Sequence, residues 1–166
     1  MIKLDRFTPR GQLFLRELAK LETLNVAVGF IAGETVALRR VGKGSKQVEE
    51  TETDIADVAM WNEYGTDTIP ARPFFRDSVK EINSILPAWW KNRLTKIMAG
   101  EEAEQSMNEL GSMAVGKIQY TILKGSYEPN MPSTIARKGS SHPLIDTGRM
   151  RQSVHYVVLP IKEGLS

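Results

Sequence analysis

The chain has 166 residues, with 22 Lys and Arg against 20 Asp and Glu, two histidines and no cysteine. This length can bury one sizeable core without disulfides or metals, so we expect a single domain spanning residues 1–166. The lack of cysteine excludes a disulfide framework, Cys-ligated zinc, an iron–sulfur cluster and a thiol nucleophile. No apolar run reaches the roughly 18 residues of a membrane span, and the N-terminus lacks a signal-peptide pattern. We therefore expect no membrane partner and a reducing, aqueous compartment.

The charges lie in blocks along the chain. Residues 36–46 carry four bases and no acid, residues 49–67 seven acids and no base, and residues 132–155 four bases and one acid. Such blocks fit solvated faces, and they also fit a molecule that packs against copies of itself, because complementary patches fix register. A DNA-binding domain usually has a larger net positive charge than the +2 of this chain.

The N-terminal third predicts one helix and two strands. Apolar residues at helical spacing predict a helix over residues 9–21. Residues 25–32 and 35–41 have strand composition, and the Ala-Gly-Glu turn between them predicts a hairpin. Residues 42–53 combine a Gly-Lys-Gly-Ser-Lys run with an acidic run and predict a mobile loop.

A short helix and a rigid extended segment are expected next. Asp54 or Thr53 can cap the helix, which ends before Gly65. Residues 68–75 contain two prolines, which push the residues before them towards extended geometry. This segment is therefore expected to cross the molecule as a stiff, apolar piece.

Two long helices are predicted in the second half of the chain. The first begins at about Arg76, and Pro87 predicts a kink or a restart. Gly100 ends it, and the acids that follow favour the start of the next helix. Gly111 and Gly116 lie inside that second helix, where they indicate close helix packing rather than a break.

The C-terminal part completes an α+β fold. Residues 126–141 predict a long loop, residues 146–154 a short capped helix, and residues 155–159 a final strand. We expect a small antiparallel sheet, formed by the N-terminal hairpin plus the C-terminal strand, packed against several helices. Two long extended loops, at about 42–53 and 126–141, belong to this expected architecture.

No constellation of residues predicts catalysis. The segment 42–46 has the composition of a phosphate loop but lacks its spacing and context. Asp54 and Asp57 lie three apart on one helix face without a converging histidine, so a divalent-ion site there is only an alternative. His142 and His155 accompany no nucleophile elbow. The sequence predicts no enzyme, no catalytic or metal site and no cofactor.

Two other kinds of binding site stay open. Arg137, Lys138, Arg149 and Arg151 form a basic patch that suits phosphate contacts, and a small nucleic-acid-binding accessory protein is the distant alternative. No aromatic residues interleave with these bases as stacking platforms. The aromatic residues elsewhere suit a ligand pocket or, more commonly, a core or subunit interface; they are Trp61, Trp89, Trp90, Phe74 and Phe75.

Two segments are more distinctive than any catalytic motif. One is Ala59–Thr66, Ala-Met-Trp-Asn-Glu-Tyr-Gly-Thr, followed by Ile-Pro-Ala-Arg-Pro-Phe-Phe-Arg at Ile69–Arg76. The other is the Pro-rich, basic segment Pro129–Ser140, followed by Pro-Leu-Ile-Asp-Thr-Gly-Arg-Met at Pro143–Met150. Together they resemble the neck and tail-completion proteins of tailed bacteriophages, a family that includes tail components of lambda-like siphophages and prophages. The resemblance covers most of the chain.

The resemblance implies a structural virion protein without catalysis. It implies a ring, of six copies, that connects head-closure proteins to the tail tube, assembled in the host bacterial cytoplasm. A tail terminator or a head-closure ring protein is the alternative within this class. The implied partners are other copies of the chain, the head-closure protein, the tail terminator and the tail tube, while DNA passes through the channel without specific recognition.

The resemblance also implies structural and interface positions rather than an active site. Arg72, held between two prolines, is expected to make a bidentate contact to a carboxylate such as Glu63, from the same or a neighbouring copy. The loops 42–53 and 126–141 are expected to reach a neighbouring subunit and to order on assembly. The full set of predicted positions is Asn62, Glu63, Gly65, Pro70, Arg72, Pro73, Phe74, Arg137, Lys138, Asp146, Thr147 and Gly148.

Overall fold

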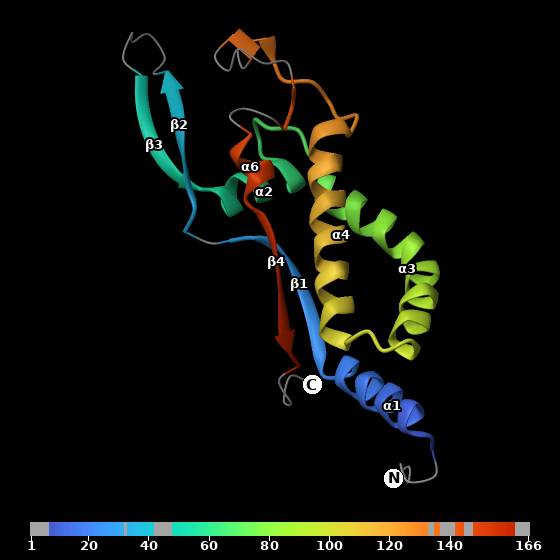
Figure 1. Ribbon diagram of the computed structural model, residues 1–166. Helices are drawn as coiled ribbons and strands as arrows, with labels where there is room; N and C mark the ends of the chain where they lie inside the picture. Colours follow the sequence, from blue (N-terminus) through green and yellow to red (C-terminus); the bar gives the residue numbers. More distant parts are fainter. Residues whose placement is uncertain are drawn as a thin grey trace. The chain divides into compact units, whose positions relative to one another are not determined.

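The computed structural model describes residues 7–31, 33–41, 48–132, 135–136, 142–144 and 148–161. Its fold is α+β, as expected (Figure 1). The helices are α1 (Pro9–Leu21), α2 (Ile55–Tyr64), α3 (Phe74–Met98), α4 (Ala103–Lys124) and α6 (Arg149–Gln152). The strands are β1 (Leu24–Phe30), β2 (Thr35–Val41), β3 (Val48–Asp54) and β4 (Val154–Pro160).

The strands pair in two separate two-stranded sheets, β1 with β4 and β2 with β3 (Figure 1). The expected hairpin between β1 and β2 is therefore wrong, although the C-terminal strand does join the first strand. The segment between β1 and β2 is tied elsewhere. The Gly33 backbone N–H donates to Asp54 Oδ2 at 2.7 Å, and the Ile55 N–H donates to the Glu34 carbonyl at 2.8 Å. These bonds hold the segment against the β3–α2 junction instead of closing a hairpin.

The acidic run is a strand over part of the predicted mobile loop. Residues 48–53 belong to β3, so the loop prediction is wrong there, and residues 42–47 lie outside the described residues. β3 is antiparallel to β2, with Arg39 opposite Glu50 and Arg40 opposite Glu49 in Cα register. Acidic residues are poor strand formers, but opposite charges across a ladder are favourable. The strand with the basic residues and the strand with the acidic residues therefore pair with each other within one chain.

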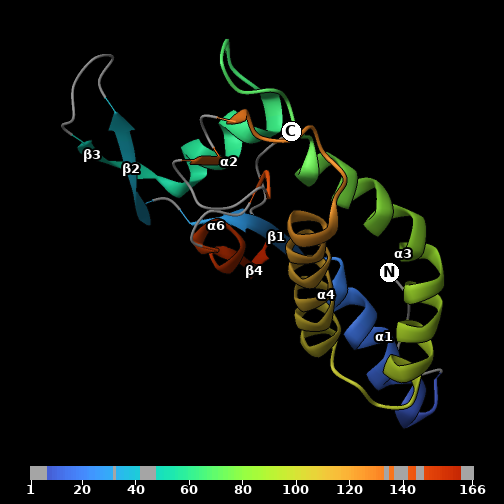
Figure 2. The same cartoon turned by 90° about the horizontal axis from the view of Figure 1, so that it is seen from above.

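The chain divides into two compact units, each assembled from separate segments. The first comprises Met1–Val28, Lys80–Val115 and Tyr156–Ser166. In it α1 contacts the turn between α3 and α4 (Figure 2): Arg10 Nε donates to the Met98 carbonyl at 3.1 Å, and Glu17 Oε2 accepts the Ala103 N–H at 2.7 Å. The glutamate thereby supplies an acceptor for a free donor in the first turn of α4.

The second unit comprises Gly29–Val79 and Gly116–His155 and contains most of the fully buried side chains. Phe74 is completely buried, and its ring meets Phe30 edge to face at a centroid distance of 6.1 Å. The other buried hydrophobic residues of this unit are Ile55, Ala59, Ile118, Ile122, Leu144, Met150 and Val154.

The helix boundaries mostly match the sequence signals. α1 has the expected bounds, and α2 begins directly after its N-cap Asp54 and ends at Gly65. α3 begins at Phe74, two residues before the expected start, and continues as one helix through Pro87, so no restart occurs there. Residues 126–131 form neither helix nor strand, in agreement with the expected loop. Residues 132 and 135–136 are helical, and the Ile135 N–H donates to the Met131 carbonyl at 3.0 Å, so the loop prediction is wrong there. Residues 133–134 and 137–141 lie outside the described residues.

The two glycines inside α4 have different surroundings. A Cβ added to Gly111 would lie 2.1 Å from Tyr156 Cδ2, whereas a Cβ on Gly116 would meet no atom within 4 Å. Close packing thus explains Gly111 and does not explain Gly116. Gly111→Ala is expected to lower the free energy of unfolding by about 1–3 kcal/mol because the ring must shift. Gly116→Ala is expected to raise it by about 0.5–1 kcal/mol because alanine favours the helix.

Denaturant unfolding of these two matched variants measures the difference. The same chemical change is made twice in one helix, so intrinsic propensity cancels and only the surroundings differ. Equal shifts of the midpoint for the two variants would contradict the packing at Gly111.

Candidate functional site

The first signature segment begins with a tightly capped helix. Asp54 Oδ1 accepts the Ala56 N–H at 2.8 Å, and Asp54 Oδ2 accepts the Gly33 N–H, so both carboxylate oxygens hold backbone donors. The hydrogen bonds from Gly33 and then Ala56 lower the pKa of Asp54 below its ordinary value of 3.8. The carboxylate therefore acts as the N-cap of α2 and ties the segment between β1 and β2 to the β3–α2 junction.

The pKa of Asp54 predicts an acid-dependent loss of stability. A carboxylate whose folded pKa is lowered stabilises the fold above the unfolded value and loses that contribution as pH falls through the folded value. Asp54→Asn keeps a capping oxygen but cannot titrate. Denaturant unfolding at neutral pH and at about pH 3 is expected to show wild type losing more stability than Asp54→Asn. Identical pH dependences would contradict the assigned hydrogen bonds.

Gly65 turns the chain sharply after α2. Its φ of +80° is in the region that favours glycine, and an added Cβ would lie 2.9 Å from the Ala71 backbone nitrogen. The Thr66 N–H donates to the Ile69 carbonyl at 2.8 Å, and the Arg72 N–H donates to the Asn62 carbonyl at 2.7 Å. The chain therefore returns along α2 after one short loop, and the predicted end of the helix before Gly65 is confirmed.

Glu63 caps the helix that follows this loop. It is 5% exposed, and its carboxylate accepts the backbone N–H of Phe75 at 2.8 Å and that of Arg76 at 3.2 Å. Arg76 Nε donates to Glu63 Oε1 at 2.8 Å, and this hydrogen bond raises the pKa of Arg76. The Arg76 guanidinium also lies 5.1 Å from the Tyr64 ring centroid. Glu63 thus joins the end of α2 to the start of α3.

Arg72 is buried and bridges three segments. Its exposure is 3%, and Nε donates to the Glu128 carbonyl at 3.0 Å, Nη1 to Asn62 Oδ1 at 3.0 Å, and Nη2 to Asn130 Oδ1 at 3.1 Å. Asn130 Nδ2 in turn donates to the His142 carbonyl at 3.2 Å. We call Arg72 with these four partner residues the Arg72 cluster. Its acceptors are amide and carbonyl oxygens, and burial lowers the pKa of Arg72.

The expected contact between Arg72 and Glu63 within one chain is wrong. The Glu63 carboxylate instead accepts the backbone N–H groups of Phe75 and Arg76 and the Arg76 Nε, because the first N–H groups of α3 have no partner within the helix. Arg72 instead faces the loop after α4. Asn130 and Arg76 were missed as site residues, since their contacts join positions far apart or across a turn and leave no local signal.

Of the remaining predicted positions, four lie among the described residues and four lie outside them. Pro70 and Pro73 are half-buried in the segment before α3, and Phe74 lies in the core of its unit. Gly148 has φ +77° and is the N-cap residue of α6. The other four predicted positions lie outside the described residues; they are Arg137, Lys138, Asp146 and Thr147.

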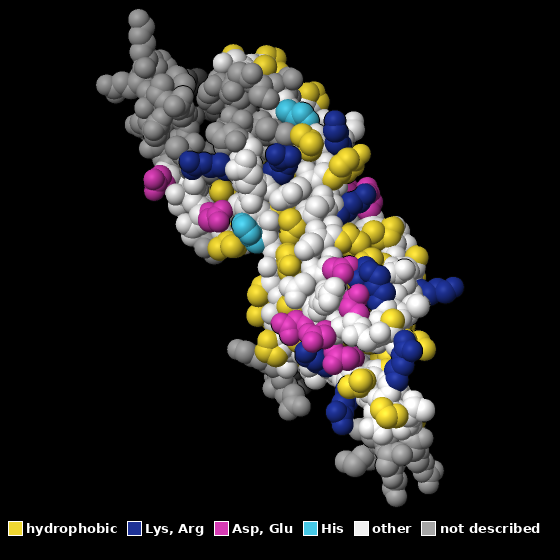
Figure 3. All heavy atoms as spheres, in the orientation of Figure 1, with side chains coloured by type: hydrophobic (Ala, Val, Ile, Leu, Met, Phe, Trp, Pro, Cys, Tyr) yellow, Lys and Arg dark blue, Asp and Glu magenta, His cyan; other side chains and the backbone are white. Residues whose placement is uncertain are grey.

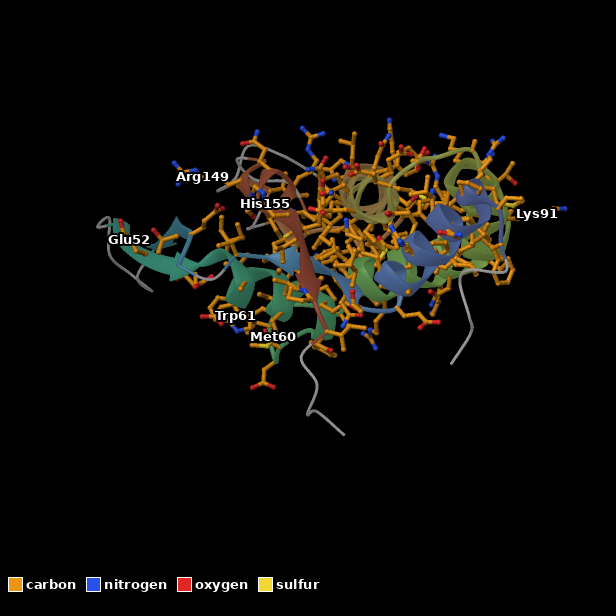
Figure 4. All side chains as sticks on the ribbon, turned by 60° about the horizontal axis from the view of Figure 1, so that its bottom comes forward. Glu52, Met60, Trp61, Lys91, Arg149 and His155 are labelled. Carbon is orange, nitrogen blue, oxygen red and sulfur yellow. The ribbon has the colours of Figure 1, made fainter. Side chains whose placement is uncertain are left out.

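One shallow pocket lies at the start of β2, with a volume of about 390 Å³. Figure 4 shows Arg149 and His155 at this end of the second unit. Arg149 Nη1 donates to the Thr35 carbonyl at 3.3 Å, and His155 Nε2 lies 3.9 Å from Glu34 Oε1. The buried Ser153 hydroxyl donates to the Met150 carbonyl at 3.1 Å. These polar groups serve the fold and do not form a nucleophile–base pair.

The aromatic residues lie in different settings. Trp89 and Trp90 contact each other edge to face, with a distance of 4.9 Å between their ring centroids. The Arg93 guanidinium carbon lies 5.3 Å from the Trp89 ring centroid. Trp61 is half-buried on α2 beside the exposed Met60 (Figure 4). On the face drawn in Figure 3, hydrophobic side chains are scattered among charged ones.

No family model, curated protein or solved structure matches this chain. Among the described residues, no group of three or more His, Cys, Asp or Glu side chains is placed to hold a metal ion. No helix in the described part of the chain has the length and apolarity needed to cross a membrane. Among the described residues, the Arg72 cluster and Glu63 bring three of the predicted positions together, Asn62, Glu63 and Arg72, and their hydrogen bonds hold backbone segments together.

Proposed function

We propose that this chain is a structural component of the neck of a tailed-phage virion. In this proposal copies of it form a ring, of six, that completes the tail and joins the head-closure proteins to the tail tube. The ring is assembled in the host cytoplasm, acts without catalysis or cofactor, and lets DNA pass without reading its sequence.

The observation that carries the proposal is the meeting of the two signature segments at one guanidinium. Asn62 and Arg72 come from the first segment, and Asn130 comes from the second, 58 residues after Arg72. A buried arginine that satisfies three separate acceptors requires all of them to be kept together. The two segments that carry the resemblance therefore meet in one hydrogen-bonded cluster.

The roles of the individual side chains give further support. Asp54 and Glu63 cap helices, Arg72 holds the Glu128 carbonyl of the loop after α4, and Asn62 Nδ2 donates to the Val58 carbonyl within α2. Side chains committed to the backbone in this way make a stiff scaffold, which suits a protein whose work is done by its surfaces.

Labelling of intact particles tests where the protein acts. A tag at the C-terminus, detected by gold-conjugated antibody in electron micrographs of virions, is expected to mark the junction of head and tail. Label along the tail, on the capsid, or in the lysate but not on particles would contradict the proposal.

A further inference from the structure

The β2–β3 ribbon has two strand edges with no neighbouring strand among the described residues. Each strand has seven residues, and the sheet that they form contains only these two strands (Figure 1). A two-stranded ribbon is marginally stable alone in water. Each outer edge also presents backbone N–H and C=O groups that another strand can pair with.

The two strands carry residues of opposite charge. β2 contains two bases, Arg39 and Arg40, and no acid. β3 contains four acids and no base. One of these acids, Glu52, is exposed and lies on the ribbon in Figure 4. Asp54 caps α2. The three other acids of β3 are Glu49, Glu50 and Glu52.

This charge pattern discriminates between the possible pairings of two copies. A β2-to-β2 contact sets bases against bases, and a β3-to-β3 contact sets acids against acids, which is unfavourable across a ladder. A contact between β3 of one copy and β2 of the next sets acids against bases. Charged edges normally prevent edge-to-edge association, but here they oppose every combination except the heterologous one.

We propose that the β2–β3 ribbon is the docking surface for a second copy of this chain, with β3 of one copy paired along β2 of the next. A heterologous contact leaves one free edge of each kind, so it repeats, and it closes into a ring when the rotation between copies allows. Successive ribbons then form a continuous antiparallel sheet in which basic and acidic strands alternate. Ring closure rests on the proposed function, whereas the edge contact itself does not.

Thiol cross-linking tests the contact directly, because the chain has no cysteine of its own. One preparation carries Ala37→Cys on β2, and a second, distinguished by a mass tag, carries Thr51→Cys on β3. A flexible bis-maleimide is added to each preparation alone and to the mixture. Heterodimers are expected in about tenfold excess over either homodimer. Ser84→Cys, at an exposed position on α3, controls for random collisions.

A charge-exchange variant tests whether opposite charges direct the contact between β3 of one copy and β2 of the next. The variant Arg39→Glu/Arg40→Glu/Glu49→Lys/Glu50→Lys restores opposite charges within its own ribbon and inverts both edges. In the cross-linking assay, the exchanged variant carrying Ala37→Cys is expected to give about tenfold fewer heterodimers with wild type carrying Thr51→Cys, because both contacting strands are then acidic. The heterodimers are expected to return when the partner carrying Thr51→Cys is also exchanged. Because the internal pairs are kept, a fold failure is not the expected cause of any loss, and circular dichroism checks this.

The outcomes separate this inference from the proposed function. Homodimer cross-links, cross-links no more frequent than the Ser84→Cys control, or an unchanged heterodimer yield when only one partner is exchanged would each overturn the edge contact. If wild type still forms rings in those cases, the proposed function stands and another surface makes the ring. Selective heterodimers that are lost when one partner is exchanged and regained when both are exchanged support the edge contact even where no neck role is found.

Discussion

Arg72→Leu is expected to lower the free energy of unfolding by about 3–5 kcal/mol. The change removes three charge-assisted hydrogen bonds and leaves Asn62, Asn130 and the Glu128 carbonyl without their donor. Two of these acceptors belong to buried or half-buried side chains, where unsatisfied polar groups are costly. Urea unfolding followed by circular dichroism gives the measurement.

Two further variants make the Arg72 test specific. Arg72→Lys keeps the charge but cannot reach three acceptors in different directions, so an intermediate loss is expected. Lys91→Ala, at an exposed position on α3, removes a cation from the surface and is expected to change stability by less than about 0.5 kcal/mol. Full retention of stability in Arg72→Leu would show that the cluster does not hold the two segments together.

Glu63→Ala is expected to lower the free energy of unfolding by about 2–3 kcal/mol. The substitution leaves the Phe75 and Arg76 N–H groups without an acceptor and also removes the ion pair to Arg76. The capping bonds are expected to dominate this loss, because the Arg76 side chain is 53% exposed and water screens its pairing with the carboxylate.

Two further single variants separate the two contributions of Glu63. Arg76→Ala removes the ion pair but keeps the backbone donors, and is expected to cost less than about 1 kcal/mol. Glu63→Gln keeps an oxygen for the backbone and is expected to lose less than Glu63→Ala. If Arg76→Ala proves as damaging as Glu63→Ala, the carboxylate acts mainly through the arginine and the assigned capping role is wrong.

Local signals predicted the helices well because their causes are local. The apolar spacing over Pro9–Leu21, the Asp54 cap of α2 and the helix ends at Gly65 and Gly100 each depend on residues close together in the chain. The α+β class followed from counting these elements.

Strand pairing and the Arg72 cluster could not be predicted in the same way. The Gly33 turn has the composition of a hairpin, but its N–H is taken by Asp54, 21 residues away. The acidic segment, residues 48–54, has the composition of a loop, because acidic residues seldom form strands. Its strand partner, residues 35–41, is predicted to pair with residues 25–32 instead. Arg72 meets Asn130 across 58 residues. A guanidinium donates to amide, carbonyl and carboxylate oxygens, so the residue types alone do not show which of them it contacts.

Electron microscopy of particles made without this protein tests the neck role most directly. The coding sequence is interrupted in the phage or prophage that carries it, and wild type and Arg72→Leu are supplied from a plasmid. The neck role predicts separate filled heads and finished tails, complete virions with the wild-type plasmid, and few with Arg72→Leu. Normal virions in the absence of the protein would contradict it.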